Sequence, residues 1–117
     1  MVLRASAEKC GEQLDLRAVT DRSVRIGGNG GDMLLRFADA VLGPEVEALR
    51  AAQDEVIATL GAAALVGAAA IAGNFSRNDR IANAIGIPLE REFVEQGADL
   101  RALLGLDRFN SARNTLG

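Results

Sequence analysis

Twenty consecutive residues without a charged side chain, from Val56 to Phe75, constrain the fold of this chain more than any other feature. Alanine and glycine dominate the run, and a break at Gly61 divides it. Only roughly a dozen uncharged residues remain beyond this glycine, a length more typical of a buried core helix than of a membrane span. Alanine and glycine also gain little on entering lipid. We therefore expect a buried helix and no membrane insertion.

This central helix is predicted to run from about Ala62 to Ile85. Its first half is apolar all round, which indicates burial on every side. Gly67 and Gly73 each cost about 1 kcal/mol relative to alanine in a helix, which makes sense if another backbone passes close by. Gly86 stands where a left-handed C-terminal residue belongs, and Pro88 follows as the stop. An apolar stripe is expected along the helix, formed by Leu65, Ala68, Ile71 or Ala72, Phe75, Ile81 or Ala82, and Ile85.

Shorter helical segments flank the central helix on both sides. Asp32 is a good N-cap for residues 33–42, and Pro44 is favoured at the first position of the next helix, which Gly61 ends. After Pro88 a last helical stretch covers residues 89–105, interrupted at Gly97. No period-2 alternation between turns indicates a strand. The sequence therefore predicts an all-α chain, a compact bundle of four or five helices. One face of the segment 44–60 is expected to carry Val46, Leu49, Gln53, Val56 and Leu60.

The N-terminal part lacks a sustained hydrophobic period. A helix around Ala5–Leu14 is only weakly indicated, and the glycine-rich run GGNGGD follows at residues 27–32. This run lacks the spacing of a phosphate-binding loop, no Lys-Ser or Lys-Thr pair follows it, and no strand precedes it. We interpret it as a flexible linker. The expected organisation is a poorly defined segment over residues 1–31 and a helical domain over residues 32–117.

Two residue counts exclude several kinds of chemistry. Histidine is absent, so neither a Ser-His-Asp nor a Cys-His nucleophile system can form, nor a His-ligated zinc or haem site. Cys10 is the only cysteine, which allows no intrachain disulfide. The N-terminus has no apolar core of signal-peptide length, so a cytoplasmic location is expected. No cofactor and no metal are predicted.

Charge and side-chain size indicate which partners to expect. The net charge of −3, the absence of a basic stripe and an aromatic content of 3% argue against nucleic-acid binding. Small apolar side chains each bury little area, at about 25 cal/mol per Å². A chain built from them gains from further burial against copies of itself. We therefore expect an obligate homo-oligomer that binds neither nucleic acid nor membrane.

The polar second half of the central helix is the candidate binding site. An arginine with asparagine partners can hold a small carboxylate through two hydrogen bonds. Alternatively, these side chains cap neighbouring helix ends and make subunit contacts, which the sequence favours because cations and amides satisfy free carbonyls near a helix C-terminus. Residues three or four apart on a helix are neighbours. The candidate ligand-binding residues are Asn74, Arg77, Asn78, Arg80 and Asn83.

The run from Asn74 to Pro88 also carries a family resemblance. An apolar helix leads into Asn-x-x-x-Asn-Asp-Arg and then an Ala-x-Gly-Ile-Pro exit. This pattern resembles the C-terminal helical signature of the carboxymuconolactone decarboxylase and alkylhydroperoxidase AhpD-like superfamily, over residues 32–90 in all. The residues that match are Asn74, Phe75, Asn78, Arg80, Ile81, Ala82, Ala84, Gly86, Ile87 and Pro88.

The resemblance implies an all-α fold that assembles into trimers, hexamers or related oligomers. Peroxidase-type members of the superfamily use a Cys-x-x-Cys pair with a nearby Glu and His. Here Cys10 is followed by Gly-Glu-Gln, and no catalytic residue of the family transfers. We expect a redox-inactive AhpD-like binding or structural module. A decarboxylase-like or peroxidase-related enzyme acting on a small acid or hydroperoxide is the alternative, so whether the chain catalyses a reaction stays open.

Overall fold

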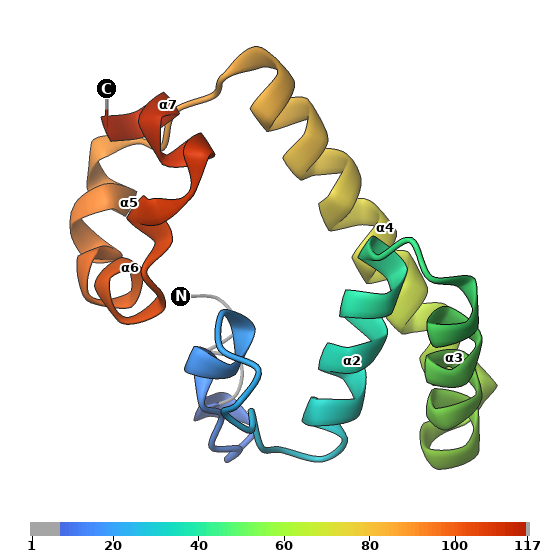
Figure 1. Ribbon diagram of the computed structural model, residues 1–117. Coiled ribbons are helices and arrows are strands. Elements are labelled where there is room, and N and C mark those ends of the chain that lie inside the picture. The colour runs from blue at the N-terminus through green and yellow to red at the C-terminus, as the bar shows by residue number, and fades with distance from the viewer. Residues whose placement is uncertain (1–7, 117) are drawn as a thin grey trace. The chain divides into compact units, whose positions relative to one another are not determined.

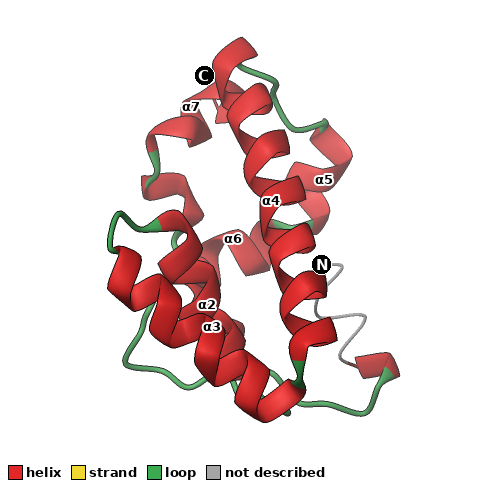
Figure 2. Ribbon diagram, turned by 90° about the vertical axis from the view of Figure 1, so that its right-hand side faces the viewer, coloured by secondary structure: helices red, strands yellow, loops and turns green. Residues whose placement is uncertain are grey.

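The computed structural model describes residues 8–116, whose regular elements are all helical (Figures 1 and 2). No strand occurs within that range, as the all-α prediction requires. Contacts divide the chain into two compact units. We call Gly27–Asn78 the hairpin unit, and residues 8–26 together with 79–116 the terminal unit. The elements are η1 (Leu16–Val19), α2 (Gly31–Leu42), α3 (Val46–Leu60), α4 (Ala62–Ile85), α5 (Arg91–Gln96), α6 (Ala98–Leu104), η2 (Leu106–Arg108), η3 (Asn110–Ala112) and α7 (Arg113–Leu116).

The core of the hairpin unit lies between α2 and α3, which pack side by side (Figure 1). Met33 and Phe37 are one helical turn apart on α2, and Ala52 and Val56 are one turn apart on α3, so each pair faces the other helix. Phe37 is 3% exposed and Val56 is fully buried. Burial of each such side chain stabilises the fold by about 1.5–3 kcal/mol. The predicted face of α3 is thus confirmed at Val56 but wrong at Val46, which is 59% exposed.

The starts of α2 and α3 differ from those predicted. Gly30, not Asp32, is the N-cap of α2, because a left-handed residue (φ +73°) turns the chain into the helix there. Asp32 lies inside the first turn, where its charge favours the positive end of the helix dipole. α3 begins after Glu45 rather than at Pro44, and it ends at Gly61 as predicted. These corrections amount to one or two residues.

α4 has the bounds that its sequence predicts, Ala62 to Ile85. Gly86 is left-handed (φ +68°), and the Ile87 amide donates to the Ala82 carbonyl at 3.0 Å, which closes the helix. The predicted burial on every side is wrong, however, since α4 contains no buried residue. Its first half contacts the core of α2 and α3 through one side only. The residues that make this contact are Ala64, Leu65 and Ala68.

The two glycines inside α4 have no close neighbour. A Cβ atom added at Gly67 or Gly73 would meet nothing within 4 Å beyond the helix itself and the adjacent residues. The sequence predicted that another backbone passes close to these glycines, and no backbone among the described residues does so. Both glycines are exposed, and neither faces α2 or α3.

The terminal unit joins both ends of the sequence. η1 packs against α6, and Ala18, Ile26 and Leu104 are its buried apolar residues. The Asp15 amide donates to the Ile26 carbonyl at 2.8 Å, which closes the N-terminal segment into a loop. This grouping differs from the expected division at residue 31. Most of the weakly indicated helix around Ala5–Leu14 is not seen: residues 5–7 lie outside the described part, and only residues 8 and 9 are helical. The predicted interruption at Gly97 is confirmed between α5 and α6.

Candidate functional site

The five candidate residues are all exposed on α4. Arg77 Nη2 donates to Asn74 Oδ1 at 2.8 Å and, at 3.5 Å, approaches Asn78 Oδ1. These contacts join three of the five residues. In the part of the chain that the structure describes, no carboxylate pairs with Arg77. The guanidinium is therefore oriented by amides, while its positive charge stays available to an anion.

Asn83 belongs to a different environment from the other four. It lines a cavity of about 310 Å³ in the terminal unit, a size at the lower limit for small-molecule pockets. The cation of this cavity, Arg101, donates to Asp107 Oδ1 through Nε at 3.1 Å and Nη2 at 2.8 Å. Its charge is therefore already paired, so the cavity offers little attraction to an anion. Sequence spacing did not indicate this cavity, because its walls come from residues more than twenty positions apart, including Asn114 and Thr115.

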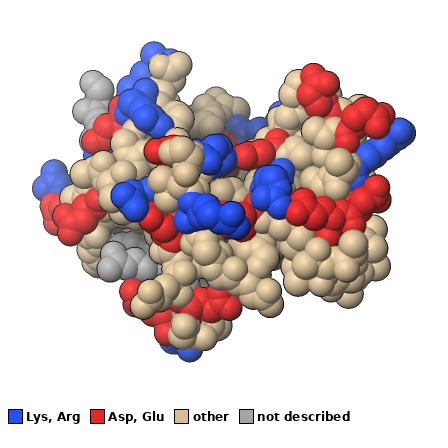
Figure 3. Space-filling view, turned by 60° about the horizontal axis from the view of Figure 1, so that its bottom comes forward, with Lys and Arg blue, Asp and Glu red and all other residues tan. Residues whose placement is uncertain are grey.

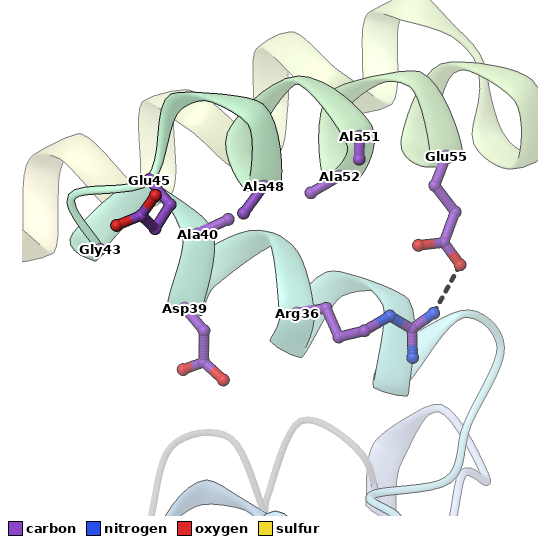
Figure 4. Close-up of a pocket in the computed structure, with 9 residues that line it drawn as sticks. All are labelled: Arg36, Asp39, Ala40, Gly43, Glu45, Ala48, Ala51, Ala52 and Glu55. Atoms are coloured by element: carbon purple, nitrogen blue, oxygen red, sulfur yellow. Dashed lines mark hydrogen bonds and ion pairs between the residues drawn. The ribbon is translucent and has the colours of Figure 1, made fainter.

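A second hollow of about 420 Å³ lies between α2 and α3 (Figure 4). Four alanines and Gly43 form its floor, and charged side chains stand at its rim. Arg36 reaches across from α2 to pair with Glu55 of α3, as the dashed line in Figure 4 shows. The two walls follow helical spacing, with residues 36, 39, 40 and 43 on α2 and residues 48, 51, 52 and 55 on α3. A floor of methyl groups presents no nucleophile and no converging polar groups, so the hollow is not built for catalysis.

The hairpin unit carries more acidic than basic residues. Six acidic and three basic residues fall within residues 27–78, and all six acids belong to the segment 32–55. In Figure 3 red side chains lie at the right of the face shown, the side on which α3 lies in Figure 1, and also at its left and bottom. Both arginines of this segment are paired, Arg36 with Glu55 and Arg50 with Glu47. An acidic surface of this kind disfavours contact with nucleic-acid phosphates.

Two carboxyl groups have lowered pKa values because of hydrogen bonds within their own turns. A hydrogen bond from Arg17 lowers the pKa of the Asp15 carboxyl, and hydrogen bonds from Ser23 lower that of Asp21. Asp15 also accepts from the Arg17 amide and so caps η1. Both carboxylates are held charged by turn contacts, with no acid–base partner beside them. Their shifts therefore stabilise the N-terminal loop rather than indicate catalysis.

Thiol and metal chemistry find little support in the structure. Cys10 is an exposed free thiol. Within residues 8–116, no three His, Cys, Asp or Glu side chains come together closely enough to hold a metal ion. No helix in the same range is long and apolar enough to cross a membrane.

Several apolar side chains of α4 are exposed. Ile71 is 62% exposed, Phe75 61%, Ile81 53% and Ile85 69%. Single exposed apolar residues are common, whereas contiguous apolar patches are typical of contact surfaces. These residues lie among the polar candidates, with Phe75 next to Asn74 and Ile81 next to Arg80. The exposed apolar residues and the candidate site therefore share the same stretch of α4.

Comparison with known proteins adds no assignment, because no protein-family model, no curated protein and no solved structure matches this chain. The resemblance to the AhpD-like superfamily accordingly stays a prediction.

Proposed function

We propose that this chain is a redox-inactive, AhpD-like helical module that works as a homo-oligomer, with α4 as its contact helix. One observation carries the proposal: α4 exposes Ile71, Phe75, Ile81 and Ile85 over a helix that packs on its own chain through one side. The resemblance of residues 74–88 to a superfamily of oligomers agrees with it. The lone cysteine and the absence of histidine leave neither a Cys-x-x-Cys pair nor a His-activated nucleophile.

Burial of these four side chains supplies free energy of about the same size as the cost of association. Complete burial of one such side chain is worth about 1.5–3 kcal/mol, so a side chain that is half to two-thirds exposed has about 1–2 kcal/mol left to gain. Eight side chains from two copies then contribute about 8–16 kcal/mol. The loss of translational and rotational freedom opposes this with about 4–15 kcal/mol. Because the two quantities are of similar size, loss of one side chain per copy is enough to shift the equilibrium.

Sedimentation velocity over a range of protein concentrations tests the proposal. We expect the mass of the wild-type chain to rise above the 12.2 kDa of the monomer as concentration increases. Ile81→Ser should restore the monomer. Ile57→Ser is the matched control, because Ile57 is also exposed, at 44%, but lies on α3. A wild-type protein that remains a 12.2 kDa species up to about 1 mM, where binding is worth only about 4 kcal/mol, would refute the proposal.

A second candidate function rests on Arg77, whose guanidinium contacts amide oxygens and no carboxylate among the described residues. In this alternative the chain binds a small carboxylate, as a binding protein or as an enzyme. Thermal unfolding in the presence of a panel of mono- and dicarboxylates tests it. A ligand should raise the melting temperature of the wild type but not of Arg77→Gln. An equal shift in both proteins would mean that Arg77 does not bind the ligand.

A further inference from the structure

Six exposed positions on α4 recur at alternating intervals of four and three residues. We call them the α4 seam: Gly67, Ile71, Asn74, Asn78, Ile81 and Ile85. At about 100° per residue they fall within an arc of about 80° and extend over about 27 Å. This alternation is the spacing by which two helices pack along one another as a coiled coil. All six positions belong to one continuous helix, with Gly67 to Asn78 in the hairpin unit and Ile81 and Ile85 in the terminal unit.

The seam is distinct from the side of α4 that is already in use. Leu65 and Ala68 contact the core of the hairpin unit, and both point more than about 90° from the centre of the seam. Ala64 also contacts that core and lies only about 60° from the centre, one turn before Gly67. The core of α2 and α3 therefore bounds the seam at its N-terminal end, and the seam begins at Gly67.

The seam is self-complementary when read from its two ends. The level of residue 76, whose own side chain points to the opposite side of the helix, marks the middle of the seam. The positions on either side form pairs at equal distance: 74 with 78, 71 with 81, and 67 with 85. We propose that a second copy of the chain packs along the seam in antiparallel orientation, with the twofold axis at the level of residue 76 in both copies. This inference rests on the proposed oligomeric function and specifies its partner and register. Such an interface is isologous, so the pair is a closed dimer.

Each pair of facing positions is chemically compatible. Ile71 meets the second copy's Ile81, which joins two apolar side chains. Gly67, with open space where a Cβ would lie, leaves room for the second copy's Ile85. Asn74 already accepts from Arg77 through Oδ1 at 2.8 Å, which leaves its amide N–H groups to donate to the second copy's Asn78. A polar residue within an otherwise apolar seam specifies register in coiled coils.

The parallel alternative fits less well. A parallel pair would place each seam residue against itself, so Gly67 would face Gly67 and leave a gap while Ile85 faced Ile85. It would also align the two helix dipoles, which the antiparallel pair opposes. The antiparallel arrangement instead sets the smallest seam residue against a bulky one at both ends.

Two side chains flank the seam near the proposed axis, and each faces the same residue of the second copy. Phe75 is on one flank, where the rings of the two copies approach each other. Arg77 is on the other flank, where two like charges come together. A single helix pair about 27 Å long also buries less than the roughly 800 Å² per partner of a standard interface. The dimer should therefore be weak and should strengthen as salt screens the arginines.

Disulfide trapping measures the register of such a weak dimer directly. Gly67→Cys and Ile85→Cys are prepared as separate proteins, both on a Cys10→Ser background, and are oxidised alone and mixed. In the antiparallel pair, positions 67 and 85 lie at the same level, whereas each position is about 27 Å from its own copy. A disulfide needs Cα atoms within about 7 Å. We expect the mixture to form covalent dimer at least about tenfold faster than either protein alone.

A matched pair of variants measures how fast disulfides form through random collisions between molecules. Gly73→Cys and Asp79→Cys also lie at the same level about residue 76, but both point away from the seam, so their mixture should link no faster than either alone. Self-linking of Gly67→Cys that outpaces the mixture, or equal rates in all samples, would overturn the antiparallel register. Absence of linking in a protein that sediments as an oligomer would overturn the seam. The proposed function would then stand only if Ile81→Ser still restored the monomer. A monomeric wild type would refute both.

Discussion

Replacement of either glycine within α4 by alanine should stabilise the protein. Alanine is favoured over glycine by about 0.8–1.0 kcal/mol in a helix interior. At Gly67 and Gly73 nothing within 4 Å opposes the new Cβ, and neither residue has a positive φ. The full helix-propensity gain of about 1 kcal/mol should therefore appear in the free energy of unfolding. These exposed positions are unusual in that a substitution inside a helix is expected to strengthen the native state.

The expected change in melting temperature follows from the entropy of unfolding. At about 2.1 cal/mol/K per residue, a chain of this length has an unfolding entropy of about 250 cal/mol/K, so 1 kcal/mol raises the melting temperature by about 4 °C. If the hairpin unit unfolds by itself, the shift is about twice as large. Circular dichroism at 222 nm measures it, at a protein concentration low enough to keep the chain monomeric.

Gly86→Ala is the matched control and should have the opposite sign. Its φ of +68° is left-handed, and the nearest atom to an added Cβ is Asn114 Oδ1 at an ordinary 3.8 Å. Backbone strain alone should then cost about 1–2 kcal/mol. A fall in melting temperature for Gly67→Ala would mean that another part of the chain packs against the face of α4 that carries the seam. That face would then not be exposed, and the α4 seam would be wrong.

Four further predictions address the core, the N-terminal loop and the seam. Phe37→Ala should lower the free energy of unfolding, measured by urea titration, by about 3–5 kcal/mol. Phe93→Ala is the control and should lower it far less, because Phe93 is 53% exposed. Equal losses in the two variants would contradict the core assigned to α2 and α3. The Asp15 carboxyl has a lowered pKa in the folded chain, so it stabilises the fold at pH values above the pKa of the unfolded chain. This stabilisation is lost as pH falls through the pKa of the folded chain. An NMR titration should show a higher Asp15 pKa in Arg17→Gln, and an unchanged pKa would mean that Arg17 is not the cause. Arg77→Gln should tighten the dimer and abolish its strengthening by salt, which sedimentation at two ionic strengths measures; weaker association would contradict the facing arginines. Asn78→Leu should tighten association but let Gly67→Cys link to itself; an unchanged linking pattern would show that the asparagine does not set the register.

Local signals in the sequence predicted the helices well because they act over a few residues. Gly61, Gly86 and Pro88 bracket α4, and its observed bounds are those predicted. The same kind of signal misplaced the start of α2, since Asp32 is a good capping residue but Gly30 can adopt the left-handed conformation that the turn requires. Competing local preferences of about 1 kcal/mol decide such ends, and a single sequence does not rank them.

Burial was the harder property to predict, because composition shows which side chains avoid water but not what covers them. The first half of α4 is apolar all round, yet one side alone meets α2 and α3. Long-range contacts between segments such as η1 and α6 could not be predicted either, since nothing near Leu16–Val19 in the sequence identifies α6 as a neighbour. The cavity walls in the terminal unit depend on the same kind of contact. Such information is carried by the whole fold rather than by any window of residues.

The asparagines of α4 show how one pattern supports two functions. Asn74 and Asn78 are polar groups beside an arginine, and this pattern predicts an anion site. Their neighbours Ile71 and Ile81 repeat at the same helical spacing and are equally exposed, so the asparagines also belong to an apolar seam. An exposed guanidinium in water binds a carboxylate weakly, whereas burial of several isoleucines gains free energy from every side chain. We therefore expect contact between copies to be the stronger effect, and anion binding at Arg77 would follow from it, since a dimer brings two such charges together.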